Sequence, residues 1–219
     1  MHIRVINSII RKLFKAEEIL SAEKFYKFIN RKKIIVFVPD KHVEKVAEGM
    51  SRAGAGIIGN YEMCSFRTSG TGTFKPGNKA NPFSGKKKTL NSVSEIKLEM
   101  ECDPADLNNV TDALLKYHPY EEKAYEIYDF KKRENKDAGV IINLKTGMKI
   151  KELFKRMNSK PETENDDPES RLFRFAVTDY GADDTIDETI LDSAKFTGCD
   201  GLISVNPKSN KKHIIFKIQ

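Results

Sequence analysis

The feature that most constrains the fold is a recurring change of hydrophobic period along residues 33–130. Segments with the alternation or β-rich composition of strands begin at Lys33, Gly56, Val93 and Tyr125. Two segments with helical spacing separate them, one after the first strand and one after the third. The order strand, helix, strand, strand, helix, strand predicts an α+β, ferredoxin-like module, with a four-stranded antiparallel sheet and both helices on one face.

Helix start and stop signals support this order. Asp40 stands where a helix cap is favoured, and Gly54 marks the end of that helix. Asp103 and Pro104 occupy the favoured cap and first-turn positions of the second helix, which Pro119 ends. The second strand is expected over 56–66, followed by a long loop from Arg67 to Asn91.

The segments on either side of this module have different patterns. Residues 1–32 are predicted to form an N-terminal helical arm, with an amphipathic helix and a second short helix capped by Ser21. Residues 131–219 begin with a charged linker at 131–137. They continue as a small, incomplete α/β lobe, with helices expected near 148–157 and 186–196 and strands at 172–178 and 201–205.

Composition narrows the class of protein. The chain of 219 residues is 39% hydrophobic and 32% charged, and no apolar run approaches the roughly 18 residues that span a bilayer. The net charge of +6 lies mostly in residues 1–32, which argues against a broad nucleic-acid surface. Three cysteines without a C-x-x-C pair indicate neither a disulfide framework nor a zinc site. We expect a cytoplasmic protein, with an organellar presequence at 1–16 left open.

The loop after the second strand is the first candidate site. Thr71, Gly72, Thr73 and Lys75 supply hydroxyls, free backbone N–H groups and an ammonium, which suit an anion or a nucleotide phosphate. The equally weighted alternative is a glycine-rich turn system with a solvated lysine run.

The second candidate site is the turn that follows the second helix. His118, Tyr120, Glu121 and Glu122 bring an imidazole, a phenol and two carboxylates within five residues, a set that suits a metal or an amine. A purely structural turn is the competing interpretation, because a histidine at a helix C-terminus is favourable through the helix dipole alone. Strand order suggests that this turn and the loop meet at a subunit boundary.

Three other patterns favour structural roles. Gly54–Gly59 matches G-x-G-x-x-G, but it follows a helix and opens a strand, the reverse of a dinucleotide site. Asp179, Asp183, Asp184 and Asp187 lack EF-hand spacing and suit the start of a helix. Cys64 has no histidine nearby in sequence that would activate it as a nucleophile.

Several strings together resemble a known family. Val36–Pro39, Gly54–Gly56, Ile58–Tyr61, Cys64–Phe66, Gly70–Phe74, Ala80–Phe83 and His118–Glu122 are similar, in order, to the inserted domain of the YqfO or Nif-three-like family, also labelled GTP cyclohydrolase 1 type 2 homologues. The resemblance covers essentially all of residues 33–130. The tail, as in 175–178 and 199–205, resembles the start of that family's second half.

The resemblance carries expectations about assembly and function. It implies a PII- or CutA-like module that forms a homotrimer and contacts a small-molecule or anionic ligand through its long loop. The family's paired divalent metals are held by histidines, an aspartate and a glutamate that cannot be placed here, so a divalent metal stays possible and the cofactor unknown. The preferred function is a non-catalytic, ligand-binding or regulatory one. The alternative is a divalent-metal-dependent hydrolase of nucleotides.

Overall fold

The computed structural model describes residues 2–158, 167–179, 187–205 and 212–216. The protein is a mixed α+β structure, and its chain divides into two compact units. Unit 1 comprises Met1–Ile29 and Arg133–Gln219, and unit 2 comprises Asn30–Lys132. Strands β1 (Ile19–Pro39) and β4 (Tyr125–Lys149) each contribute residues to both units. None of the described helices is long and apolar enough to span a membrane.

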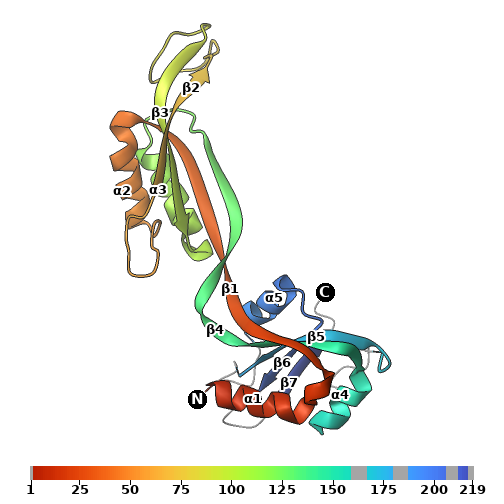
Figure 1. The fold of residues 1–219 in the computed structure, drawn as a ribbon. Helices are drawn as coiled ribbons and strands as arrows, with labels where there is room; N and C mark the ends of the chain where they lie inside the picture. Colours follow the sequence, from red (N-terminus) through yellow and green to blue (C-terminus); the bar gives the residue numbers. More distant parts are fainter. Residues whose placement is uncertain (1, 159–166, 180–186, 206–211, 217–219) are drawn as a thin grey trace. The chain divides into compact units, whose positions relative to one another are not determined.

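Unit 2 contains the elements predicted to form the central module (Figure 1). After β1 come α2 (Val43–Arg52), β2 (Phe66–Phe74), β3 (Asn91–Cys102), α3 (Leu107–Tyr117) and the first part of β4. The strand order in this unit is β2-β3-β1-β4. Strand β3 is antiparallel to both β1 and β2, with Val36 opposite Leu98 and Gly70 opposite Glu95.

The core of unit 2 lies between one face of this sheet and the two helices. Ile34, Val36 and Val38 of β1 alternate with residues of the opposite face, and all three are fully buried. Val46 and Met50 of α2 pack into the same cluster. Burying side chains of this size contributes about 1.5–3 kcal/mol each, so this face of the sheet is fixed by its helix contacts.

The structure of unit 2 differs from the sequence prediction between the end of α2 and the start of β3. The strand predicted over 56–66 is wrong, because the chain turns there: Gly56 and Gly59 have positive φ, and an isolated bridge joins Ile58 to Tyr61. The strand instead occupies 66–74, inside the segment predicted as a loop. The connection between β2 and β3 is therefore shorter than expected and runs from residue 75 to 90.

Unit 1 is a sheet with helices on both faces. Its strands follow the order β1-β4-β5-β6-β7, where β5 is Arg171–Thr178, β6 is Gly201–Val205 and β7 is Lys212–Phe216. One face packs on α1 (His2–Leu13) and α4 (Ile150–Met157), and the other packs on α5 (Glu188–Phe196). Phe25 of β1 is completely buried in the α5 cluster.

Three expectations for this unit need correction. No helix starts at Ser21, since residues 19–39 form one strand. Residues 131–137 are no linker but part of β4. Residues 1–29 also do not stand apart as an arm: Leu13 is 1% exposed in a core shared with Phe175 of β5. They supply a helix and a strand to the α/β lobe, whose own strands are too few for a covered sheet.

An ion-pair group ties the N-terminal segment to α4 within unit 1. Arg156 donates to both carboxylate oxygens of Glu18 at 2.6 Å, and to the Leu13 carbonyl oxygen at 2.8 Å. This forked contact holds the pKa of Glu18 at about 2, with hydrogen bonding to Arg156 as the main cause.

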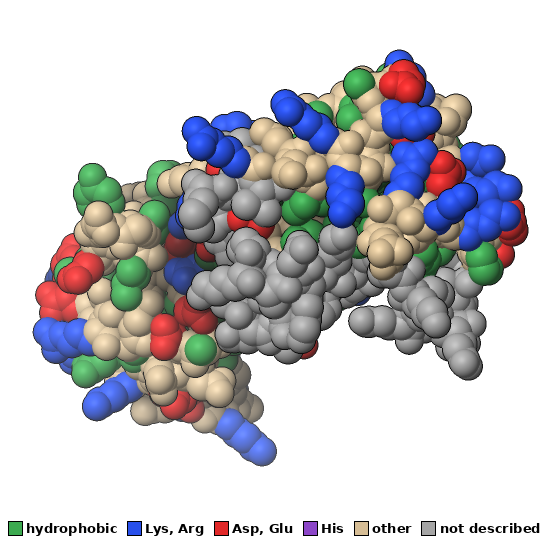
Figure 2. Space-filling view, turned by 90° about the horizontal axis from the view of Figure 1, so that it is seen from below, with side chains coloured by type: hydrophobic (Ala, Val, Ile, Leu, Met, Phe, Trp, Pro, Cys, Tyr) green, Lys and Arg blue, Asp and Glu red, His purple; other side chains and the backbone are tan. Residues whose placement is uncertain are grey.

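The charged side chains on the surface are of both signs. On the face drawn in Figure 2, basic and acidic side chains are interspersed over much of the described surface.

Candidate functional site

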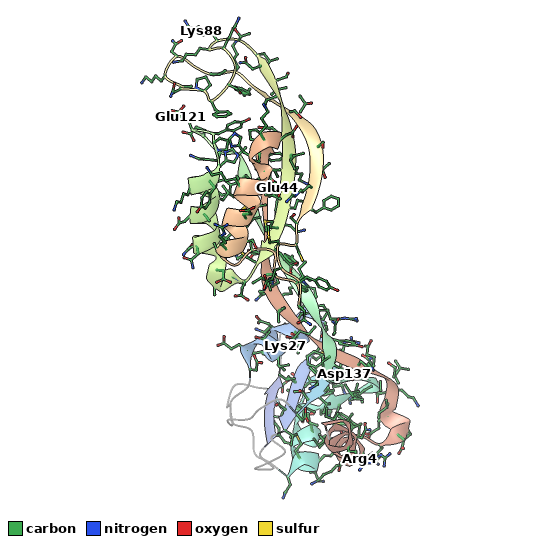
Figure 3. The ribbon with its side chains drawn as sticks, turned by 90° about the vertical axis from the view of Figure 1, so that its left-hand side faces the viewer. Arg4, Lys27, Glu44, Lys88, Glu121 and Asp137 are labelled. Carbon is green, nitrogen blue, oxygen red and sulfur yellow. The ribbon has the colours of Figure 1, made fainter. Side chains whose placement is uncertain are left out.

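A pocket of about 280 Å³ forms in unit 2 where the β2–β3 loop meets the turn after α3. Figure 3 labels Glu121 on that turn and Lys88 on the loop. The pocket walls are largely apolar, from Phe74, Pro76, Pro82 and Phe83. Six of the eight predicted site residues line it: Gly72, Thr73, Lys75, Tyr120, Glu121 and Glu122. The two segments therefore come together within one chain, whereas the sequence suggested a subunit boundary.

Local hydrogen bonds give the loop a defined path. The backbone N–H of Asn81 donates to Oε2 of Glu121 at 2.7 Å, which joins the loop to the turn. The Asn91 side chain accepts from the Lys86 N–H at 2.8 Å and donates to the Thr89 carbonyl at 2.7 Å. Because these bonds close the loop at its base, its proline and phenylalanine side chains can serve as pocket walls.

His118 lies behind the pocket rather than in its lining, and only 5% of it is exposed. Its Nε2 is 2.9 Å from the carbonyl oxygen of Phe37, and its Nδ1 is 3.1 Å from the backbone N–H of Tyr120. A carbonyl only accepts and an N–H only donates, so this histidine is the neutral tautomer with its proton on Nε2. Burial lowers the pKa of His118, which agrees with a neutral ring. Both ring nitrogens are occupied, and the imidazole orders the turn.

The Tyr120 ring packs between His118 and Phe83, which lines the pocket. Its ring centroid lies 4.9 Å from that of His118 and 5.9 Å from that of Phe83, which in turn meets His42 at 5.5 Å. Its hydroxyl oxygen is buried and forms no hydrogen bond of ordinary length within the described part of the chain. Burial raises the pKa of Tyr120, and the neighbouring Glu95 carboxylate raises it further. The phenol is therefore protonated, and the Glu95 carboxylate is its polar neighbour in the pocket lining.

Glu95 is the site residue that the sequence analysis missed. It lies in the middle of β3, where alternation assigns it to the solvent side of a strand. In the structure it lines the pocket, and its carboxylate sits over Gly72 of the neighbouring strand. A Cβ atom at Gly72 would lie 2.1 Å from the Glu95 Oε2 atom, so glycine leaves the space that the carboxylate fills. Only the pairing of β2 with β3 reveals this relation.

The other predicted groups occupy structural positions. Thr71 is exposed on β2 beside the pocket and is not part of its lining. Asp187 caps α5, accepting from the Thr189 N–H at 2.9 Å, as the helix-start interpretation predicts. Asp183 and Asp184 lie outside the described residues. All three cysteines are free. Across the described ranges, no group of three or more His, Cys, Asp or Glu side chains is arranged to hold a metal ion.

Comparison with known proteins identifies relatives by sequence. No family model matches the chain. The GTP cyclohydrolase 1 type 2 homolog of Halalkalibacterium halodurans is 44% identical over 126 residues, which are 57% of this chain and 34% of that protein. The Bacillus subtilis protein of the same name is 40% identical over 123 residues, 56% of this chain and 33% of its own length. The chain thus spans about a third of the length of these curated relatives.

Solved structures with partial similarity have related names. A Bacillus cereus protein related to NIF3 is 26% identical, with a TM-score of 0.43, over 92% of this chain and 53% of that one. The PII-like protein CutA from Nostoc is 15% identical, with a TM-score of 0.33, over 44% of this chain and 78% of that one. Over the stretch that it shares with these curated proteins, the chain is similar in sequence to the GTP cyclohydrolase 1 type 2 homologues, with identities of 40% and 44%.

Proposed function

We propose that unit 2 is a ferredoxin-like module of the PII and CutA type, and that it binds a small molecule in the pocket and acts as a non-catalytic, regulatory part of the protein. The pocket at the β2–β3 loop is the observation that carries this proposal. It is concave and mostly apolar, and a few polar groups converge in it, as expected of a small-molecule site.

The arrangement of the elements supports the fold part of the proposal. The order strand, helix, strand, strand, helix, strand is that of a split βαβ unit, and the strand order β2-β3-β1-β4 places the first and third strands in the centre. Residues of α2 and α3 pack into one core with the sheet. In this arrangement the β2–β3 connection is free to carry binding residues, since it is not needed to complete the core.

A ligand-binding test follows from the pocket shape. Ala80 lines the pocket, so Ala80→Trp should fill it, whereas Ala105→Trp places the same side chain at an exposed position of unit 2 that does not line the pocket. We expect a fragment library screened by saturation-transfer NMR to give ligands that bind the wild type and Ala105→Trp but lose at least about tenfold in affinity for Ala80→Trp. Ligands that bind all three proteins equally, or no ligands at all, would refute the proposal.

A second candidate function rests on the name of the curated relatives, which points to nucleotide chemistry with GTP. It is separable from the first by metal analysis of the purified chain and an assay of GTP turnover. We expect no GTP turnover from this chain. Two tightly held divalent ions per chain, together with turnover of GTP, would reverse the choice in favour of a metal-dependent hydrolase.

The sheet of unit 2 also supports a proposal on assembly. Its helices cover one face, while the other carries Phe66 and Tyr128, which are 65% and 52% exposed, beside the charged residues Lys97 and Glu99. We propose that a homotrimer covers this face, as the family resemblance implies. Light scattering at micromolar concentration should give three times the chain mass of 24.9 kDa. A monomer at that concentration would contradict this assembly.

A further inference from the structure

We infer that the pocket of unit 2 selects a compact organic cation, a primary ammonium group carried on an apolar body. The inference rests on the proposed function, because it takes the pocket to be a ligand site and assigns the class of ligand. The sequence alone assigned an anion to the loop and a metal or an amine to the turn that follows the second helix. The geometry of four features decides between them.

The first feature is the balance of charge around the cavity. Three carboxylates line it, from Glu95, Glu121 and Glu122, against one ammonium, from Lys75. Within the described residues, none of these carboxylates forms an ion pair. Lys75, Glu121 and Glu122 are all exposed, so solvent screens their charges, whereas the half-buried Glu95 is screened less. The negative charge in the cavity is therefore uncompensated and favours a cation over an anion.

The second feature is the position of Glu95. Its side chain is half-buried, and it faces the neighbouring strand across Gly72. A carboxylate in a partly desolvated place gains more from a bound cation than a fully hydrated one does. Of the three acids, we therefore expect Glu95 to contribute most to binding the ammonium group.

The third feature is the buried hydroxyl of Tyr120. Its oxygen is buried without a hydrogen-bond partner of ordinary length in the described chain, although it lies in the lining of an open pocket. The Glu95 carboxylate is the group of the chain that neighbours this hydroxyl, so the two side chains together present oxygen acceptors to a donor on a ligand. An ammonium N–H group placed between Tyr120 and Glu95 would satisfy both.

The fourth feature is the apolar wall. Phe74, Phe83 and the ring of Tyr120 surround the space next to these polar groups. Aromatic faces attract cations as well as apolar surface, so the wall accommodates the body of an amine without excluding its charged end. His118 offers no competing cation, since both of its nitrogens are bound to the backbone.

Three probes with one body and different head groups test the inference. Phenethylammonium, 2-phenylethanol and 3-phenylpropionate share a phenyl ring but carry a positive, a neutral and a negative end at pH 7. We expect isothermal titration calorimetry of the whole chain to show saturable binding of phenethylammonium, at least about tenfold tighter than that of the alcohol and without detectable binding of the acid. Raising the salt concentration should weaken the ammonium binding.

Variants locate the effect in the pocket. Glu95→Gln should weaken phenethylammonium binding at least about tenfold, whereas Glu62→Gln removes an exposed acid of unit 2 that does not line the pocket and should leave it unchanged. Lys75→Gln should tighten it, because the one repelling cation is removed. Equal binding of the ammonium to wild type and Glu95→Gln would overturn the inference.

The outcomes also separate this inference from the proposed function. If 3-phenylpropionate binds and Lys75→Gln abolishes its binding, the pocket is a ligand site but selects anions. If none of the three probes binds while the fragment screen gives ligands sensitive to Ala80→Trp, the assignment of a cation is wrong and the proposed function stands. If that screen gives none, both fail.

Discussion

Phe175→Ala is expected to lower the free energy of unfolding of unit 1 by about 3–5 kcal/mol, the range for removing a buried phenylalanine. Phe175 of β5 is fully buried, and its ring centroid lies 5.4 Å from that of Phe14, which follows α1. The substitution removes the ring at the point where the N-terminal segment meets the sheet. It leaves a cavity that well-packed neighbours fill only in part.

Amide hydrogen exchange in the native state measures this loss and assigns it to a unit. Exchange should accelerate in α1, α4 and β5, which share the core of Phe175, and stay close to that of the wild type in α2 and α3. The matched control is Phe173→Ala, because Phe173 lies on the same strand and is 50% exposed, so its loss should cost less than about 1 kcal/mol. Equal effects of the two substitutions would contradict the burial that the structure shows.

His118→Ala is expected to destabilise unit 2 by about 2–3 kcal/mol. The substitution removes two hydrogen bonds and leaves the Phe37 carbonyl oxygen and the Tyr120 N–H without their partner at a partly buried position. The turn then loses the link that sets Tyr120 against Phe83, so ligand binding at the pocket should weaken as well. Urea denaturation of both proteins measures the first effect, with His42→Ala as the control, because His42 is half-buried and contacts the Phe83 ring.

His118 also makes the free energy of unfolding depend on pH, in a direction that follows from the shift of its pKa. The pKa of His118 is lowered in the folded state, chiefly by burial, below the ordinary histidine value of about 6.5. The unfolded chain therefore binds more protons at acid pH, and stability falls as the pH drops below about 6.5. Lys123 and His42 lower the pKa and Glu95 raises it, so their charges modulate the size of the effect.

A variant without this titration tests the assignment. His118→Gln keeps a donor for the Phe37 carbonyl but cannot be protonated, so its loss of stability between pH 7 and pH 5 should be smaller than that of the wild type. Unfolding free energies at both pH values decide the matter. Identical pH slopes for the two proteins would show that His118 does not titrate in this range.

The sequence by itself determined the features that depend on near neighbours. Alternation identified the core face of β3, and a β-rich composition identified the strand that begins at Lys33. The cap signals at Asp103 and Asp187 marked the starts of their helical segments, where each side chain accepts from the backbone N–H two residues later. The order of elements in residues 33–130 followed from these local periods. Six of the eight candidate site residues line the pocket, and all six belong to the two short segments that the sequence analysis identified.

Tertiary structure alone decided the features that depend on distant partners. Ser21 has the character of a helix cap, but the residues around it form a strand, in which Phe25 is buried against α5, more than 160 residues away. Glu95 lines the pocket because β2 pairs with β3. His118 lies outside the lining because the Phe37 carbonyl, 81 residues earlier, holds its ring. Propensity and spacing describe a chain segment, whereas pairing, burial and the hydrogen-bond partner of a side chain are set by segments that meet only in the folded protein.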